Sequence, residues 1–415
     1  MSLLDLYVEH CGAEEVKLLR QMGEMLEGLR LVHVNSTRRG GGVAEILERL
    51  VPLQRELGID SSWEVIEGDP DFFEVTKAFH NALQGRRQHV SDSMIAAYEA
   101  ANLRNWTAMR DKLEDADFVF IHDPQPAMMA SLSTARRGKW IWRCHIDASN
   151  PDRKVWRYLA GHVNHCDAAI FSLPDFAQPL DIPEFIIPPA IDPISPKNQY
   201  ISPEECERVL ESLGIDLKDP SHLVVQVSRF DRFKDPLGVI RACELALRRV
   251  GDLRLVLAGG GADDDPEGAA VLEEVNRCAE RLPFVKVLLL PPDAHMAINS
   301  LQRSAQVVFQ KSTKEGFGLT VSEALWKGKP VIGGDTGGIR LQVLNQITGY
   351  RVQTPEGASL RLVELLNNPR ERERMGRAGR ELVKEHFLIT RLLRNHLSLM
   401  LALQAGSGSG RVEVL

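Results

Sequence analysis

Short apolar runs alternate with amphipathic helical segments along most of the chain. The runs that predict buried strands cover residues 29–35, 117–122, 140–145, 168–172, 222–227, 253–258, 285–290, 306–310 and 330–333. Between them, apolar residues recur at helical spacing, as in the segments 71–83 and 92–113. Strands that alternate with helices are typical of parallel sheets whose two faces are both covered. The pattern therefore predicts an α/β fold of the doubly wound, Rossmann-like kind.

A proline-dense stretch separates two halves that each repeat this alternation. The stretch, residues 185–196, has the composition of an extended linker between domains. A chain of 415 residues is long for one domain and sufficient for two, each with its own core. We therefore expect one Rossmann-like domain at 1–190 and another at 191–386. A helix at 387–405 and a flexible tail at 406–415, rich in Gly and Ser, complete the predicted organisation.

The strongest candidate site is a glycine turn that opens a helix directly after a predicted strand. Gly316 and Gly318 let the backbone approach a ligand, and the first amides of the helix lack partners, so the turn suits a phosphate. Glu315 and Glu323 flank the turn, and carboxylates accept hydrogen bonds from sugar hydroxyls. Each glutamate alone has a simpler explanation, because Glu323 could complement the helix dipole and Glu315 could be solvated. Both together favour a sugar-binding role. The residues predicted to bind the ligand at this turn are Gly316, Phe317, Gly318, Leu319, Thr320 and Glu323.

A basic pair marks a second candidate for phosphate binding. Arg229 and Lys234 lie between the strand at 222–227 and a helix that begins near Leu237. An Arg side chain can hold two phosphate oxygens at once and a Lys adds a compact charge, so the pair suits a diphosphate. The alternative is a solvated basic loop. The acidic run at 263–265 could ligate a hard cation, but a flexible loop beside glycines explains it better, and no metal site is predicted.

In the first half, polar residues gather where predicted strands end. Asp123 and Gln125 follow one strand, and His145 and Asp147 lie at the end of the next. Ligands of open α/β sheets bind beyond the carboxyl ends of the strands, so these residues are candidate ligands. One histidine at a strand end is more often structural, but two polar clusters at equivalent places favour a binding site. The loop at 36–42 contains three glycines without the dinucleotide-binding spacing, and its place between strand and helix favours a ligand loop over a flexible turn.

Composition narrows the classes of function. The net charge of −7 argues against nucleic acid or an anionic membrane as the main partner. No apolar run is long enough to span a bilayer, and the acidic N-terminal segment does not resemble a signal peptide. The six cysteines show no paired metal-binding spacing and are expected to be reduced thiols. We therefore expect a cytoplasmic protein that acts on small molecules.

The glutamates and the glycines together show a family resemblance. The motif Glu315-x(7)-Glu323 around Gly-Phe-Gly-Leu resembles the signature of retaining nucleotide-sugar glycosyltransferases of the GT-B fold. The resemblance implies two Rossmann-like domains facing across a cleft, with the last helix crossing back to the first domain. It also implies that Glu315 lies by the transferred hexose and that Glu323 holds the ribose of the donor. Arg229 and Lys234 would then hold the leaving diphosphate. No protein nucleophile is firmly established in this family, so Glu315 is expected to position the hexose and stabilise charge.

The same resemblance extends to the first half of the chain. It implies that Gly41 and Gly42 lie beside the donor phosphates and that His145 contacts the transferred hexose. The segment around Asp123 would face the acceptor. The predicted catalytic residues are Glu315, Arg229, Lys234 and His145, and the predicted acceptor-binding residues are Asp123, Gln125 and Asp147.

Three further sequence segments indicate which members of this glycosyltransferase family the chain resembles. The segments 40–45, 122–126 and 143–147 are similar to those of trehalose glycosyltransferring synthases, which join a nucleotide-activated glucose to free glucose. This resemblance covers nearly the whole chain except the terminal tail. After a second glycine turn the chain reads Gly-Gly-Ile-Arg, with Arg340 in place of the usual Pro-Glu sequence. No donor contact is therefore carried over from that loop.

We accordingly expect a configuration-retaining hexosyltransferase that makes trehalose from a nucleoside-diphosphate glucose and glucose, without a tightly bound cofactor. A retaining trehalose phosphorylase, which uses inorganic phosphate and glucose 1-phosphate, shares the fold, although a ribose ligand at Glu323 favours a nucleotide user. A nucleotide-sugar epimerase of the same fold would need no acceptor. A non-catalytic sugar-nucleotide sensor is disfavoured by the intact charged pairs. The nucleotide base, the direction, stimulation by a divalent metal and the oligomeric state, with a homodimer among the options, stay open.

Overall fold

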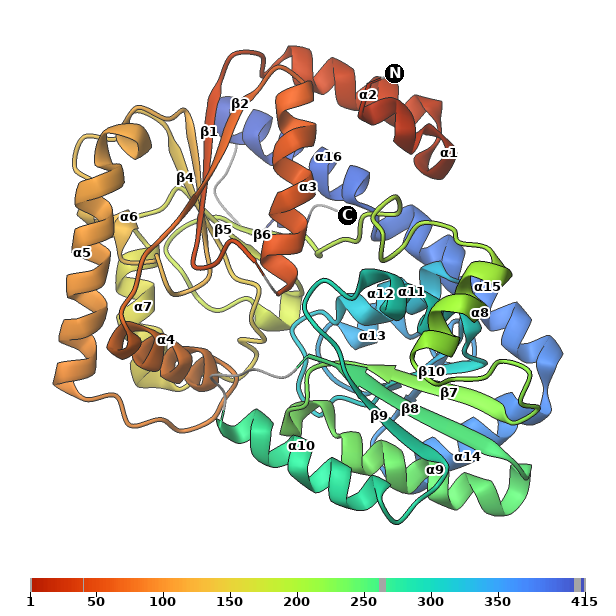
Figure 1. Ribbon diagram of the computed structural model, residues 1–415. Helices are drawn as coiled ribbons and strands as arrows, with labels where there is room; N and C mark the ends of the chain where they lie inside the picture. The colour runs from red at the N-terminus through yellow and green to blue at the C-terminus, as the bar shows by residue number, and fades with distance from the viewer. Residues whose placement is uncertain (1, 40, 261–265, 407–411, 414–415) are drawn as a thin grey trace. The chain divides into compact units, whose positions relative to one another are not determined.

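The computed structural model describes residues 2–39, 41–260, 266–406 and 412–413 (Figure 1). The chain divides into two compact units. The first unit consists of Met1–Ala190 together with Ile389–Leu415, and the second of Ile191–Leu388. Among the described residues, no helix combines the length and the apolar character needed to cross a membrane.

The sheet of the first unit has seven strands in the order β13-β6-β5-β4-β3-β1-β2. These strands are β1 (Arg30–Asn35), β2 (Asp60–Val65), β3 (Phe118–His122), β4 (Lys139–Arg143), β5 (Ala168–Phe171), β6 (Glu184–Ile186) and β13 (Val412–Glu413). All of their pairings are parallel. The order reverses between β1 and β3, because β2 lies on one side of β1 and the later strands follow β3 on the other.

Helices supply the crossover connections that parallel strands require. The helical elements of this unit are η1 (Leu4–Tyr7), α1 (Val8–Cys11), α2 (Ala13–Glu24), α3 (Gly42–Glu56), α4 (Pro70–Leu83), α5 (Asp92–Glu114), α6 (Met129–Leu132), α7 (Arg153–Val163), η2 (Pro174–Phe176) and α16 (Ile389–Gln404).

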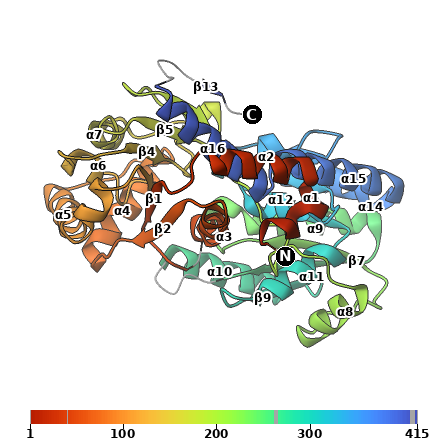
Figure 2. The same ribbon diagram turned by 90° about the horizontal axis from the view of Figure 1, so that it is seen from above.

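The helix α16 comes from the far end of the chain and packs against α2 and α3, and Figure 2 shows it beside α2. An ion pair between Arg394 and Glu15 joins α16 to α2.

The sheet of the second unit has six strands in the order β12-β11-β10-β7-β8-β9, again all parallel. They are β7 (His222–Val227), β8 (Leu253–Gly259), β9 (Val285–Leu289), β10 (Val307–Gln310), β11 (Val331–Gly334) and β12 (Gly349–Val352). Successive residues of a strand point to opposite faces, so Val224 and Val225 belong to two different hydrophobic clusters. The sheet is therefore buried on both faces.

The helical elements of the second unit connect these strands and cover the two clusters. They are α8 (Pro203–Ser212), η3 (Arg232–Lys234), α9 (Pro236–Val250), α10 (Pro266–Ala279), α11 (His295–Ser304), α12 (Leu319–Trp326), α13 (Ile339–Gln342), α14 (Pro355–Asn367) and α15 (Pro369–His386). Several begin with a proline in the first turn, as expected where the amide proton is not needed. The order of the strands reverses between β7 and β10.

Some elements differ from the sequence predictions. The strand expected at 140–145 ends at Arg143, so His145 lies in the loop beyond it. The apolar pattern does not reveal β2, because polar residues interrupt it, or β6, which lies at the start of the expected linker. Within the expected tail at 406–415, the structure describes Gly406 and β13, which pairs with β6. The rest of that tail, and the acidic run at 263–265, lie outside the described residues.

The reversal of strand order marks where a ligand is expected in each unit. Loops after the two strands at a reversal run in opposite directions and leave space at the carboxyl edge of the sheet. In the second unit these loops follow β7 and β10, and they carry Lys234 and Glu315. In the first unit the loop after β3 begins with Asp123. The fold thus explains why the predicted residues can meet although they are distant in sequence.

Truncation of Leu393 on α16 is expected to destabilise the first unit. This side chain has 0% exposure, whereas Leu103 on α5 is 53% exposed. Leu393→Ala should lower the free energy of unfolding by about 2–5 kcal/mol, and Leu103→Ala should change it by only about 0.5 kcal/mol. Urea unfolding followed by tryptophan fluorescence measures the difference, because five of the six tryptophans lie in the first unit. Equal effects of the two substitutions would contradict the packing of α16 in this unit.

Candidate functional site

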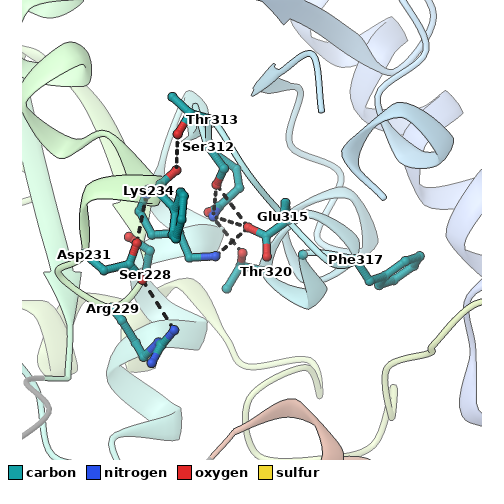
Figure 3. A network of polar contacts seen from close by, with 12 residues as sticks. Ser228, Arg229, Asp231, Lys234, Ser312, Thr313, Glu315, Phe317 and Thr320 are labelled. Carbon is teal, nitrogen blue, oxygen red and sulfur yellow. Dashed lines mark hydrogen bonds and ion pairs between the residues drawn. The ribbon is translucent and has the colours of Figure 1, made fainter. Parts of the chain in front are cut away.

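The loops after β7 and β10 bring Lys234 and Glu315 together in the second unit (Figure 3). The Nζ atom of Lys234 lies 2.6 Å from Oε2 of Glu315. The same oxygen accepts hydrogen bonds from Ser312 Oγ at 3.0 Å and from Gln310 Nε2 at 3.2 Å. Two predicted catalytic residues therefore form one ion pair, and three donors converge on a single carboxylate oxygen. Among the described contacts, none involves Oε1 of Glu315.

The environment of Glu315 keeps its carboxylate ionised. The residue is buried, with 9% of its surface exposed. Burial alone would raise the pKa of Glu315, but the charge of Lys234 and the hydrogen bonds to the carboxylate outweigh burial and hold the pKa below its ordinary value. At neutral pH this side chain is an acceptor and a negative charge. It is not suited to donate a proton.

The backbone around Lys234 is fixed on both sides. Asp231 Oδ1 accepts a hydrogen bond from Lys234 N at 3.1 Å, and Gln226 Nε2 donates to Lys234 O at 3.0 Å. The next residue, Asp235, has a left-handed conformation with φ 48°, and its carboxylate caps α9 by accepting from Gly238 N at 3.1 Å. Two successive caps thus hold the lysine at the carboxyl edge of the sheet.

Arg229 lies in the same loop but outside the hydrogen-bond network of Glu315 (Figure 3). Its Nη2 atom is 3.4 Å from Asp231 Oδ2, and 67% of its side chain is exposed. An exposed ion pair of this length is weak, because water screens both charges. The guanidinium can therefore turn toward a ligand at low cost.

The glycine turn after β10 ends at Gly318, which precedes α12. Gly318 has φ 82°, and no side chain caps the helix, so its first amides point outward without a side-chain acceptor. The second glycine motif packs closely on this turn. Gly338 N donates to Gly316 O at 3.1 Å, and a β-carbon on Gly338 would lie 2.4 Å from Phe317 Cα. The two glycine motifs in the sequence therefore belong to one local structure.

The larger side chains of the turn are used for packing. Phe317 is buried in the hydrophobic core and points away from Glu315 (Figure 3). Leu319 packs against the same core. Thr320 Oγ1 donates to Gln310 Oε1 at 3.0 Å, which orients the amide that holds Glu315. Of the residues predicted to bind the ligand here, Phe317 and Leu319 can thus offer backbone groups rather than side chains.

Glu323, on α12, is almost fully buried, with 2% of its surface exposed. Its Oε1 lies 3.6 Å from Lys197 Nζ, and its Oε2 is buried without a partner within the described part of the chain. Lys327, one turn further along the helix, donates to the backbone oxygen of Glu323, and burial lowers the pKa of Lys327 to about 7. Buried polar atoms are normally hydrogen-bonded, so the carboxylate of Glu323 retains the capacity for one more donor.

In the first unit, the half-buried His145 joins a line with the buried residues His33 and His122. His145 Nε2 lies 3.0 Å from His122 Nδ1, and His122 Nε2 lies 3.1 Å from His33 Nδ1. Gln54 Oε1 is 3.1 Å from His33 Nε2 and ends the line. Sequence reasoning singled out His145 but missed His33 and Gln54, since nothing local marks either residue. Knowledge of the strand order would have been needed to place them together.

Asp123 fixes the backbone of His145. It has a left-handed conformation with φ 64°, and its Oδ1 accepts from His145 N at 2.7 Å. Burial raises the pKa of Asp123 to about 7, although the hydrogen bond from His145 and the charge of Arg143 oppose this shift. Non-glycine residues in this conformation are uncommon and cluster at functional sites. The left-handed backbone of Asp123 and its position after β3, where the strand order reverses, both indicate a functional site.

The remaining predicted residues have varied environments. Gln125 Oε1 is buried without a partner among the described residues. Asp147 Oδ1 accepts from Ser149 N at 3.1 Å and Ser149 Oγ at 2.6 Å, so this carboxylate closes a turn. Gly41 has φ 82° and precedes α3, and Gly42 is the first residue of that helix. In the described ranges, no group of three or more His, Cys, Asp or Glu side chains is arranged to hold a metal ion.

Removal of Lys234 is expected to destabilise the second unit. Lys234→Met leaves a buried carboxylate without its cation and should lower the free energy of unfolding by about 3–5 kcal/mol near pH 7. The double variant Lys234→Met/Glu315→Leu should recover most of the loss, because an apolar pair then replaces the ion pair. Arg229→Met is the matched control at an exposed cation and should cost at most about 1 kcal/mol. Denaturant titration gives these values, and a double variant no better than Lys234→Met would contradict the pairing.

The same pair generates a dependence of stability on pH. Because folding lowers the pKa of Glu315, the stabilisation from its ionised form is present above the ordinary Glu pKa of about 4.3 and is lost as the pH falls through the lowered value. Without the charge of Lys234, burial raises the pKa of Glu315 in the variant, so the difference in unfolding free energy between the wild type and Lys234→Met should shrink as the pH falls from about 7 and should keep shrinking below about 4.3. Titrations at several pH values measure it, and a constant difference would exclude an ionised Glu315 as the cause.

Comparisons with known proteins find a matching family for a large part of each unit. Residues 33–178 match the family described as the trehalose synthase N-terminal domain, and residues 212–382 match the group 1 glycosyl transferases. The chain is 41% identical to a trehalose synthase of Pyrococcus horikoshii over 96% of this chain and 95% of that protein. It is 41% identical to a trehalose synthase of Rubrobacter xylanophilus over 92% of each protein. A trehalose phosphorylase of Pleurotus pulmonarius is 29% identical over 84% of this chain and 53% of that protein.

Solved structures confirm the predicted GT-B fold. Sucrose-phosphate synthase from Thermosynechococcus elongatus superposes with a TM-score of 0.70 at 17% identity, covering 91% of this chain and 100% of that one. An α,α-trehalose-phosphate synthase from Burkholderia xenovorans gives a TM-score of 0.73 at 16% identity, covering 90% of this chain and 100% of that one. The fold follows from these structures, and the family follows from the identity of 41% along nearly the full length of both sequences. The chain belongs to the trehalose synthase family of glycosyltransferases.

Proposed function

We propose that this protein is a configuration-retaining hexosyltransferase that makes trehalose from a nucleoside-diphosphate glucose and free glucose. The observation that carries the proposal is the arrangement of Glu315. Its Oε2 is occupied by three protein donors, while Oε1 has no described partner and can accept from a sugar hydroxyl. A carboxylate held in this way is an oriented acceptor that binds a hexose without reorganising.

The second unit also offers the groups that a leaving diphosphate needs. Negative charge builds on the diphosphate as its bond to the sugar breaks, and fixed positive groups stabilise this charge. Lys234, the exposed guanidinium of Arg229 and the uncapped amides of α12 supply such groups. Glu323 Oε2 retains capacity for a ribose hydroxyl. These features support a nucleotide-sugar donor.

No protein nucleophile is needed in this proposal. The ion pair with Lys234 keeps Glu315 charged and in place, which suits positioning and electrostatic stabilisation. The acceptor hydroxyl attacks the anomeric carbon on the face from which the diphosphate departs, and its proton passes to the departing phosphate. Configuration is retained because the new bond forms on the same face as the one that breaks. In the first unit, His145 would contact the hexose, and Asp123 and Gln125 would contribute to the acceptor side.

The relatives support trehalose as the product. The proteins that match along nearly their full length are named trehalose synthase. The trehalose phosphorylase of Pleurotus pulmonarius matches over 53% of its own length, which gives weaker support for phosphorolysis. The substrates are small molecules, and the proposal needs no tightly bound cofactor, nucleic acid or membrane.

Product analysis tests the proposal directly. The purified protein is incubated with glucose and ADP-, UDP- or GDP-glucose, beside a reaction with glucose 1-phosphate, and the disaccharide and released diphosphate are measured. We expect α,α-trehalose and an equal amount of diphosphate from at least one nucleotide donor. Trehalose from glucose 1-phosphate alone would instead make the protein a phosphorylase. Consumption of the donor without an acceptor would indicate an epimerase.

Two glutamate variants separate the proposed roles. Glu315→Gln keeps the shape but removes the charge, and should lower kcat by about 100-fold while the donor still binds. Glu323→Gln should raise the KM for the donor by about tenfold with a smaller change in kcat, because it weakens one hydrogen bond to a charged acceptor. Steady-state kinetics measure both effects, and Glu356→Gln, at an exposed glutamate of the same unit, is the control. Unchanged turnover in Glu315→Gln would refute its proposed role.

A further inference from the structure

Three histidines, of which His33 and His122 are buried and His145 is half-buried, form an unbroken line of hydrogen bonds across the sheet of the first unit. His33 lies on β1, His122 ends β3, and His145 lies two residues beyond the end of β4. The ring nitrogens that face each other are 3.1 Å apart between His33 and His122 and 3.0 Å apart between His122 and His145. The line begins at Gln54 on α3. At its other end, Nδ1 of His145 has no partner in the described part of the chain.

The register of the sheet explains this line. His33 pairs with Phe120 across β1 and β3, and His122 pairs with Arg143 across β3 and β4. Each histidine therefore lies one strand over and two residues nearer the carboxyl edge than the one before. Alternate residues of a strand share a face, so the rings can meet on the same side of the sheet. The line thus leads from the interior of the sheet to the edge where ligands of this fold bind.

Burial fixes the charge of these rings. It lowers the pKa of His33 to about 4 and lowers the pKa values of His122 and His145 well below the ordinary value for histidine. All three rings are therefore neutral at neutral pH. A neutral imidazole has one nitrogen that donates and one that accepts. In a line in which each inner nitrogen is hydrogen-bonded, the tautomer of one ring determines the tautomer of the next.

Gln54 sets the direction of the line. Its Oε1 accepts from Ser61 Oγ at 2.7 Å and lies 3.1 Å from His33 Nε2. With the Gln54 amide in this orientation its oxygen can only accept, which requires the proton of His33 on Nε2 and leaves Nδ1 to accept from His122 Nε2. It follows that His122 Nδ1 accepts from His145 Nε2. The outer end of the line, His145 Nδ1, then carries a lone pair.

We propose that His33 and His122 are positioning residues that hold His145 as the Nε2-protonated tautomer, so that its Nδ1 accepts a hydrogen bond from a hydroxyl of the transferred hexose. The identity of this ligand rests on the proposed function. A lone pair that is already oriented binds the hydroxyl without a change of tautomer or ring rotation. His33 and His122 act through His145 and do not touch the substrate.

The groups around the line favour the same neutral, oriented ring. Asp123 Oδ1 fixes the backbone of His145 by accepting from its N at 2.7 Å. The buried guanidinium of Arg143 disfavours a positive charge on His145. His396 on α16 lies beside His33, with 6.4 Å between ring centres, and makes no hydrogen bond in the line. Among the described residues these histidines do not converge as metal ligands would.

Nitrogen NMR of the unliganded full-length protein tests the proposal. Protein labelled with ¹⁵N-histidine shows for each ring which nitrogen is protonated, and a His145→Gln variant assigns the resonances of His145. We expect a protonated Nε2 and an unprotonated Nδ1 at His145 near pH 7. His122→Phe, which keeps a ring but removes both hydrogen bonds, should give a mixture of tautomers at His145. Gln54→Met should do the same from the far end of the line, in case His122→Phe folds poorly.

His396→Phe is the matched control, because it changes a neighbouring buried ring without breaking the line. It should leave the His145 resonances unchanged. A His145 protonated on Nδ1 in the wild type would overturn the proposal and would mean that the Gln54 amide has the opposite orientation. Resonances of His145 that stay the same in both His122→Phe and Gln54→Met would also overturn it.

Kinetics then connect the tautomer with turnover. His122→Phe and Gln54→Met should lower kcat for trehalose formation by about 10- to 100-fold, by analogy with the loss of outer hydrogen-bond partners of metal-binding histidines. Unchanged kcat in variants whose His145 tautomer has changed would exclude the positioning role. The NMR measurement needs no substrate, so a protein that makes no trehalose would refute the proposed function while the tautomer result would still stand.

Discussion

Parallel pairing of the strands is the constraint on which both candidate sites depend. Parallel strands place all of their carboxyl ends at one edge of the sheet, and helices must carry the chain back each time. As a result, β7 and β10 are neighbours although β8 and β9 lie between them in sequence. Lys234 and Glu315 meet because they follow these two strands. In the first unit, the same constraint sets His33, His122 and His145 one strand apart.

The hydrogen bonding of buried carboxylates differs within the second unit. Glu315 Oε2 is satisfied by three donors that belong to the protein, which fixes the group in one orientation. Glu323 Oε2 is buried and has no such donor among the described residues. Burial without a partner is costly, and native proteins retain few such atoms. The protein itself therefore orients the Glu315 carboxylate, while Glu323 Oε2 can still accept a hydrogen bond from a ligand.

The sequence predicted the features that depend on local pattern. Apolar runs located β1, β3 and β5, the glycine turn led to Glu315 and Glu323, and the basic pair Arg229 and Lys234 marked the loop after β7. Features that depend on the assembled sheet were not predictable in this way. The polar residues of β2 conceal a strand whose pairing with β1 becomes evident only from the sheet order.

The side chains near the site also differ in whether the local sequence reveals their role. Phe317 lies in a promising motif, but its ring is needed in the core, and the motif alone does not report where a side chain points. His33 and Gln54 come from different elements and meet because β1 and α3 lie next to each other in the fold. A residue that acts through another residue leaves no local pattern of its own. The line of histidines is therefore visible only in three dimensions.

The division of the chain at Ala190 and Leu388 determines which parts of the gene encode each unit. The second unit is one continuous segment, and the first is formed from two segments that flank it. Ile191 N donates to Phe387 O at 2.9 Å, so the second unit starts and ends at adjacent points. Units with neighbouring ends are well suited to insertion and to circular permutation. One continuous gene segment therefore encodes the whole second unit. The first unit needs two segments, because α16, which completes its packing, is encoded after the second unit.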